Sequence, residues 1–391
     1  MQKNIPDVDL DIYSFESLEN PYDNYKVFRE TAPIVRLPKY DLYLMSRFET
    51  VRNALRNWQV FSSAHGVAMN DVMNQAIAGG TLGSDDPVHA HLRGIVGRPL
   101  SPSNLEALKA RISKQAEDHV NRLCDLGKFD AATDLAQYLP LTIVSELVGL
   151  PDEGRERMLI WAAANFNSLA PRGLQLTEEA LPILGEMVAY AKNSTPDRVR
   201  PGSWVAQLYD ASERGEISYE QVGALMNDYL GPSLDTTIFA TGNAISLFAK
   251  HPGEWDKLVA NPALIPNAIN EALRLESPIQ GFSRYAVDNY EAEDQVLPAG
   301  SRVLVMYGSG NRDERRWGNP EDFDIERKNM DHLGFGHGVH TCLGMNLAKL
   351  EITALLTALV KRVKRFEITG PTKLVKNSIL RGFETLPVTI H

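Results

Sequence analysis

The stretch from Leu333 to Glu351, LGFGHGVHTCLGMNLAKLE, places one cysteine, Cys342, between a run of glycines and a helical pattern. Glycines at 334, 336, 338 and 344 permit tight turns and close approach of the backbone to a flat or bulky partner. Apolar residues recur at helical spacing from Leu343, so Cys342 lies at or just before a helix N-terminus. The N–H groups and positive dipole end there favour a thiolate over a thiol. A thiolate held by a glycine-rich loop suits a haem iron.

The other cysteine, Cys124, is far from Cys342 in the chain, and no CxxC pair occurs. This count argues against a disulfide framework, a zinc site of several thiolates and a four-thiolate iron–sulfur cluster. Cys124 lies on a helical apolar stripe in HVNRLCDLG, which predicts a core position.

A second group of polar residues lies in the middle of the longest predicted helix. This helix opens with a capping-box pattern at 218–221 and ends at KHPG, 250–253. Pro232 has no N–H and clashes with the preceding turn, so we expect a kink or an opening there. Asp235 and Thr236 follow at once. From the residues alone, a buried polar patch on a bent helix explains them as well as a functional role does.

The remaining pattern predicts one large domain over residues 1–391, mainly helical with a minor β region. Most segments have the apolar spacing of helices, whereas APIVRLPKYDLYLMSRF alternates as strands do. We find no repeat and no Gly/Ser linker that would divide the chain.

Charge and hydropathy limit the classes of partner. The net charge of -10 argues against a nucleic-acid binder, which would need an excess of Lys and Arg. The first residues lack the apolar core of a signal peptide, and no later apolar run is long enough to span a bilayer. We therefore expect a cytoplasmic protein without a membrane partner, acting on small molecules or proteins.

The decapeptide FGHGVHTCLG matches the cysteine-ligand signature FGxGxHxCxG of the cytochrome P450 family at every fixed position, and on it the chain resembles that family. The resemblance implies the P450 fold, with a long central helix over haem b, and Cys342 as the iron ligand. It also places Phe335, Gly336 and Gly344 around the cofactor. An inert buried cysteine remains the alternative. A dinucleotide loop does not fit, because the GxGxxG register fails at Val339.

Further segments agree with the resemblance in order and spacing. EALR matches the family's ExxR, with Glu271 and Arg274 on one helix face, and Arg327 matches the third member of its buried Glu-Arg-Arg cluster. That role is structural. DDPVHAHLR, PIQGFSR and the cysteine loop imply four partners for the two haem propionates: His89, Arg93, Arg284 and His340. His91 and His337 match no role, and we expect them to be exposed.

The segment PSLDT aligns with the (A/G)Gx(D/E)T motif that the family's central helix carries over the haem. The resemblance makes Asp235 and Thr236 the acid and alcohol that deliver protons for oxygen cleavage in a mostly dry pocket. Pro232 and Ser233 depart from the usual small residues at their positions. The proton route is therefore expected to include the Ser233 hydroxyl.

The implied reaction is monooxygenation, in which O2 and two electrons insert one oxygen atom into the substrate. No flavin or ferredoxin module fits in the chain, so a separate ferredoxin and its NAD(P)H-dependent reductase are the expected donors. Candidates for a basic docking patch are Arg98, Lys349, Arg362 and Arg365, although ordinary surface charge explains them equally well.

The substrate is expected to be small, apolar and aromatic. FSSAHGVAM with SPIQGFSR is similar to a bacterial subgroup that oxidises para-substituted benzoates, yet 62–86 contain no Lys or Arg to meet a carboxylate. A neutral aromatic, hydroxylated or O-demethylated, fits better. Expected pocket walls are 67–73, 166–172, 228–233, 279–282 and 380–383. Two alternatives stay open: a peroxide-using or rearranging enzyme, and a haem sensor or carrier without turnover.

Overall fold

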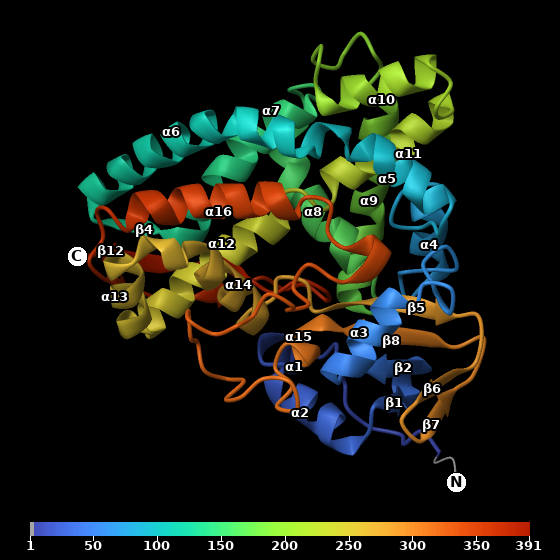
Figure 1. Cartoon of the computed structure of the whole chain (residues 1–391). Coiled ribbons are helices and arrows are strands. Elements are labelled where there is room, and N and C mark those ends of the chain that lie inside the picture. The colour runs from blue at the N-terminus through green and yellow to red at the C-terminus, as the bar shows by residue number, and fades with distance from the viewer. Residues whose placement is uncertain (1–3) are drawn as a thin grey trace.

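The computed structural model describes residues 4–391. Helices dominate, and small sheets gather mainly around the N-terminal part of the chain (Figure 1). The helices are α1 Phe15–Glu19, α2 Tyr22–Thr31, α3 Phe48–Arg56, α4 Asp71–Ile77, α5 Val88–Val96, α6 Pro102–Leu126, α7 Ser145–Val148, α8 Met158–Asn167, α9 Gln175–Asn193, α10 Trp204–Glu213, α11 Tyr219–Leu230, α12 Asp235–Lys250, α13 Pro252–Ala260, α14 Ile265–Leu275, α15 Tyr307–Gly310 and α16 Met345–Leu359. The prediction of a mainly helical chain with a minor β region is confirmed.

The largest sheet has the strand order β1-β2-β8-β5-β3, with β2 and β8 parallel and the other pairs antiparallel. The predicted alternating segment supplies β1 and β2, which pair in register from Ile34 with Met45 to Leu37 with Leu42. The strands are β1 Ile34–Leu37, β2 Leu42–Met45, β3 Phe61–Ser62, β4 Lys128–Asp130, β5 Gly281–Ala286, β6 Tyr290–Ala292, β7 Gln295–Leu297, β8 Arg302–Met306, β9 Phe366–Ile368, β10 Lys373–Leu374, β11 Phe383–Thr385 and β12 Pro387–Ile390.

The main hydrophobic core lies among the helices, and α12 runs through it. Every residue of α12 from Thr237 to Phe248 is buried, because most side chains on all faces of this helix are apolar or small. Helix α16 packs on α6 and on α14, which places the end of the cysteine segment beside this core. Cys124 is half-buried and packs at the core's edge, close to its prediction.

The long helix predicted from 218 to 253 is two helices. The predicted capping box at Ser218 and Gln221 starts α11, which ends at Leu230, and α12 begins at Asp235. Pro232 accounts for the opening because it donates no hydrogen bond. The side chain of Asn165 also packs against the break, since a Cβ at Gly231 would lie 2.7 Å from its Nδ2. The opening places backbone and polar side chains where a continuous helix would have a closed surface.

No helix within residues 4–391 combines the length and apolarity that crossing a membrane requires.

Candidate functional site

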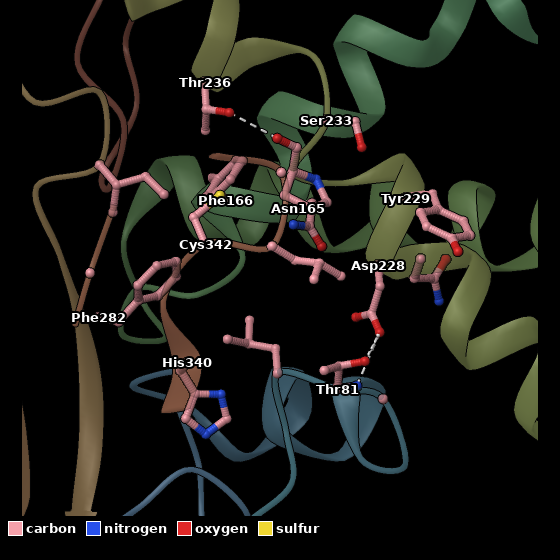
Figure 2. A pocket seen from close by; sticks show the side chains of 18 of the residues that line it. Thr81, Asn165, Phe166, Asp228, Tyr229, Ser233, Thr236, Phe282, His340 and Cys342 are labelled. Carbon is pink, nitrogen blue, oxygen red and sulfur yellow. Dashed lines mark hydrogen bonds between the residues drawn. The ribbon is translucent and has the colours of Figure 1, made fainter. Parts of the chain in front are cut away.

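A large internal cavity lies between the segment that carries Cys342 and the break between α11 and α12 (Figure 2). We call residues 333–344 the cysteine loop. We call the facing surface, formed by residues 76–82, 165–169 and 224–237, the distal wall. Both contribute side chains to the cavity, together with residues of α5, α9, β5 and α16.

The cysteine loop is held by close backbone contacts. Gly336 and Gly338 have positive φ values of 71° and 78°, a conformation that side chains with a Cβ rarely adopt. A Cβ at Gly338 would lie 2.3 Å from the carbonyl oxygen of Leu55. The N–H of Cys342 donates to the carbonyl of Phe335 at 2.9 Å, which closes the loop. The glycines are therefore required by geometry at this position, as the sequence suggested.

Cys342 lies near the end of the loop, three residues before α16 begins at Met345, and its side chain opens onto the cavity. Burial raises the pKa of the Cys342 thiol, while the N–H groups of Gly344 and Met345 and the charge of Arg93 oppose this rise. The helix start therefore supports a thiolate, as expected, but does not outweigh burial by itself. Coordination to a metal ion would deprotonate the thiol outright.

Four basic side chains meet beside the loop. Arg93, Arg284 and His340 line the cavity. The ring of His89 is buried beside that of His340, with the two ring centroids 4.1 Å apart. The Nε2 atoms of His89 and His340 are buried without a hydrogen-bond partner. Burial, followed by the charges of Arg284, His89 and Arg93, lowers the pKa of His340 to about 2.

Asp86 Oδ1 lies 3.1 Å from His89 Nδ1, but Arg93, Arg284 and His340 form no ion pair among the described residues. Two orphaned ring nitrogens and two cations in one corner fit a ligand with two carboxylates, because buried polar groups need partners. The two propionates of a haem would accept hydrogen bonds from these side chains, so the residues present fit the cofactor implied by the sequence.

A buried ion-pair network supports the loop from behind. Arg274 donates to both carboxylate oxygens of Glu271 at 2.8 and 2.9 Å, and Arg327 Nε donates to Glu271 at 2.9 Å. Burial acts to raise the pKa of Glu271, but these hydrogen bonds lower it below its ordinary value. Arg274 also binds the carbonyl of Asn311, whose Oδ1 accepts from the N–H of Leu333 at 2.7 Å. The network thus reaches the first residue of the loop, in line with the predicted structural role.

The acid and alcohol at the start of α12 differ in position. Thr236 lines the cavity and donates to the carbonyl of Pro232 at 2.9 Å, which bridges the opening (Figure 2). Ser233 also lines the cavity. Asp235 is only 4% exposed and lies beside the cavity rather than in its lining. Burial alone raises the pKa of Asp235 to about 7.

The distal wall contains a second carboxylate, Asp228, which begins the expected wall segment 228–233 but was given no role of its own from the sequence. Asp228 Oδ2 accepts hydrogen bonds from the N–H of Thr81 at 3.0 Å and from its Oγ1 at 2.6 Å. Figure 2 shows this pair to one side of the cavity, well apart from Cys342. The helix is interrupted between Asp228 and Asp235, so the available signal was the place of Asp228 in the expected wall segment.

Four of the five expected wall segments contribute to the cavity, through Met73, Phe166, Asp228 and Phe282 among others. The expectation for 380–383 is wrong, because these residues do not line it among the described residues. Residues 76–82 and the face of α9 at 184–188 were missed. Both are placed by tertiary packing, which no local pattern reveals.

The expected basic patch is largely neutralised. Arg98 pairs with Glu216, Arg362 with Asp125 at 3.1 Å and Arg365 with Glu367 at 3.6 Å. Lys349 is half-buried over the ring of Phe335, with its Nζ 5.3 Å from the centroid. Two histidines were expected to be exposed. His91 is exposed, whereas His337 is half-buried, so the expectation for His337 was wrong.

Comparisons with known proteins agree with this geometry. The cytochrome P450 family model matches residues 185–383. Cytochrome P450 CYP199A2 of Rhodopseudomonas palustris is 34% identical, and the match covers 99% of this chain and 95% of that protein. Cytochrome P450-terp of a Pseudomonas species is 30% identical, over 94% of this chain and 92% of its own. The crystal structure of CalO2 aligns with a TM-score of 0.84 and 26% identity, over 98% of this chain and 99% of that one.

Proposed function

The chain belongs to the cytochrome P450 family, and from that premise we propose that Cys342 ligates the iron of haem b in an enzyme that oxidises a small aromatic compound. The family establishes an oxidoreductase of the monooxygenase type with a haem held by a cysteine thiolate. The observation that carries the assignment of Cys342 is the cavity itself. Its lining combines this thiol with the side chains of Arg93, Arg284 and His340.

The cofactor is expected to rest between the cysteine loop and the distal wall. Phe335, Gly336 and Gly344 all line the cavity beside Cys342, and their backbone leaves room for a flat group. His89, Arg93, Arg284 and His340 would hold the propionates, which satisfies both orphaned Nε2 atoms. When bound, a haem with a thiolate ligand supplies the activation of O2.

The reaction consumes substrate, O2, two electrons and two protons, and it yields the oxygenated product and water. The chain's own part is to supply the protons. The Thr236 hydroxyl faces the cavity, and the carboxyl of Asp235 has a pKa of about 7, so it exchanges a proton readily at neutral pH. Ser233 Oγ is a second hydroxyl along this surface. We propose that protons pass from Asp235 to these hydroxyls.

The walls favour a small apolar substrate. Phe166, Leu169 and Phe282 line the cavity with other apolar side chains. Arg93 and Arg284 also line it, but they lie in the cluster that would hold the propionates. Hydroxylation or O-demethylation of an aromatic compound is the proposed reaction.

The electrons are proposed to come from a ferredoxin and an NAD(P)H-dependent ferredoxin reductase. A cytoplasmic location stays a prediction from the sequence.

The decisive experiment is the difference spectrum of the reduced protein with carbon monoxide, because a thiolate ligand shifts the haem band in a way that imidazole does not. We expect the thiolate band in the unmodified protein and its loss in Cys342→Ser. Cys124→Ser is the matched control, since it removes the only other cysteine and should leave the band unchanged. An unchanged spectrum in Cys342→Ser would contradict the assignment. Product formation with O2, NADH and surrogate redox partners then separates an oxygenase from a haem carrier.

A further inference from the structure

The cavity contains one carboxylate that the proposed oxygen chemistry does not use, Asp228 of α11. Its Oδ2 is held by the N–H and the hydroxyl of Thr81, a residue of the segment that follows α4. These two bonds fix the orientation of the carboxylate. Its Oδ1 accepts no hydrogen bond from the part of the chain that the structure describes, 4–391, and Asp228 lines the cavity.

No charge compensates Asp228. Within residues 4–391 no Lys, Arg or His forms an ion pair with it. Two cationic side chains of the described residues line the cavity, Arg93 and Arg284. Both lie near His340, in the cluster of basic side chains that would hold the propionates. Burial raises the pKa of Asp228 to about 6, against the effect of the Thr81 hydrogen bonds. At pH 7.5 the group is therefore mostly ionised, with a free acceptor oxygen.

Asp228 is half-buried and its free oxygen opens onto the cavity, so a ligand that displaces water from this oxygen binds more favourably when it brings a hydrogen-bond donor. A ligand carboxylate at the same place would instead meet like charge. Asp228 and Thr81 lie well apart from Cys342 across the cavity, and aromatic side chains such as Phe166 and Phe282 line the space (Figure 2).

We propose that Asp228 is a specificity residue that accepts the hydrogen bond of a phenolic hydroxyl, with the group to be oxidised at the opposite end of the aromatic ring. The inference rests on the proposed function and narrows its substrate class to phenols with an apolar group across the ring. It also excludes benzoates, whose carboxylate would face Asp228.

Three ligands that differ only at one end test this proposal: 4-methoxyphenol, 1,4-dimethoxybenzene and 4-methoxybenzoate. Each is titrated into the haem-loaded protein at pH 7.5, and binding is followed by the spin-state change of the haem and by calorimetry. We expect the phenol to bind about tenfold or more tightly than either of the others, the factor that a hydrogen bond to a charged group contributes.

Asp228→Asn should change the sign of this preference. The N–H of Thr81 can only donate, so the amide oxygen of the variant is expected to turn toward Thr81 and its NH2 group toward the cavity. The wall then offers a donor, and the ether and the benzoate should gain affinity relative to the phenol. Asp71→Asn is the matched control, because Asp71 is 84% exposed on α4 and should leave all three affinities unchanged.

Equal affinities for phenol and ether in the unmodified protein would overturn the proposal, even if Asp228→Asn failed to fold. A preference for the phenol that persists in Asp228→Asn would overturn it as well. These outcomes leave the proposed function intact so long as the carbon monoxide spectrum has the thiolate band. Absence of that band instead refutes the proposed function, independently of the binding series.

Discussion

The two sides of the cavity are built on different principles. Behind the cysteine loop, Glu271 is fully buried with its carboxylate oxygens paired, and its network extends to the loop's first N–H. On the distal wall, Asp228 and Asp235 are carboxylates without an ion-pair partner among the described residues, beside an opened helix. A satisfied buried network fixes geometry, whereas unsatisfied groups are available for ligands and protons. The comparison suggests that one side holds the cofactor and the other selects and serves the substrate.

The largest effect is expected from breaking the network behind the cysteine loop. Glu271→Ala leaves Arg274, which is 0% exposed, as an unpaired buried cation. We expect a loss of about 3–5 kcal/mol in the free energy of unfolding, together with poor retention of haem. Denaturant unfolding and the ratio of haem to protein measure both.

Lys373→Ala is the control for this variant, because it breaks the exposed pair between Lys373 and Glu384 and should change stability by about 1 kcal/mol or less. Similar losses in the two variants would mean that the buried network behind the cysteine loop stabilises the fold no more than an exposed ion pair does.

The second effect belongs to the distal wall and depends on pH. Asp235 has a pKa of about 7 in the folded protein against an ordinary value of 3.8, so the folded state binds the proton more tightly. Stability from this group is present below pH 3.8 and is lost as the pH rises toward about 7. The stability of Asp235→Asn relative to the unmodified protein should therefore increase by roughly 4 kcal/mol from pH 4 to pH 8.

Chemical denaturation of the haem-loaded protein and of Asp235→Asn, each at several pH values, measures this difference. A difference between the two proteins that does not vary with pH would show that Asp235 is well solvated or paired, and the contrast between the two walls would weaken.

Much of the cysteine side was predictable from sequence because its chemistry fixes residue types at short spacings. Gly336 and Gly338 must be glycine for their backbone conformation, and Glu271 lies three residues from Arg274 so that they can pair on one helix face. Such local constraints leave a pattern. The alternation of β1 and β2 and the capping box at Ser218 are predictable for the same reason.

The distal wall was predicted less well because distant segments form it. The sequence predicted a kink or an opening at Pro232, but not the packing of Asn165, a residue of α8, against the break between α11 and α12. Asp228 gains its environment from Thr81, which is 147 residues away. No short-range periodicity predicts a contact of that kind. The prediction that residues 380–383 form part of the cavity wall was wrong for the same reason, because it depended on contacts between distant segments.

A smaller effect is expected from Gly338→Ala in the cysteine loop. The variant must adopt a φ of 78° and place its Cβ against the carbonyl of Leu55, so the loop has to shift. We expect a loss of roughly 2 kcal/mol in stability and a weaker hold on haem. Thermal unfolding and haem retention measure these quantities.

Gly202→Ala separates the two causes, since Gly202 has a φ of 73° but a Cβ added there would meet nothing within 4 Å. It should lose about 1 kcal/mol and keep haem. Equal losses in both variants would show that the contact with Leu55 does not constrain the loop.

The smallest effect concerns the orientation of Asp228. Thr81→Val removes the hydroxyl that donates to Asp228 at 2.6 Å and keeps the backbone N–H that donates at 3.0 Å. Loss of one of two bonds frees the carboxylate to rotate and raises its pKa further, so affinity for 4-methoxyphenol at pH 7 should fall by about 1 kcal/mol. Thr142→Val is the control, because that hydroxyl donates to the carbonyl of Tyr138 at an exposed position. Tighter phenol binding in Thr81→Val would mean that Thr81 competes with the substrate for Asp228 rather than presenting it, and the distal wall would then resemble the self-satisfied network behind the cysteine loop.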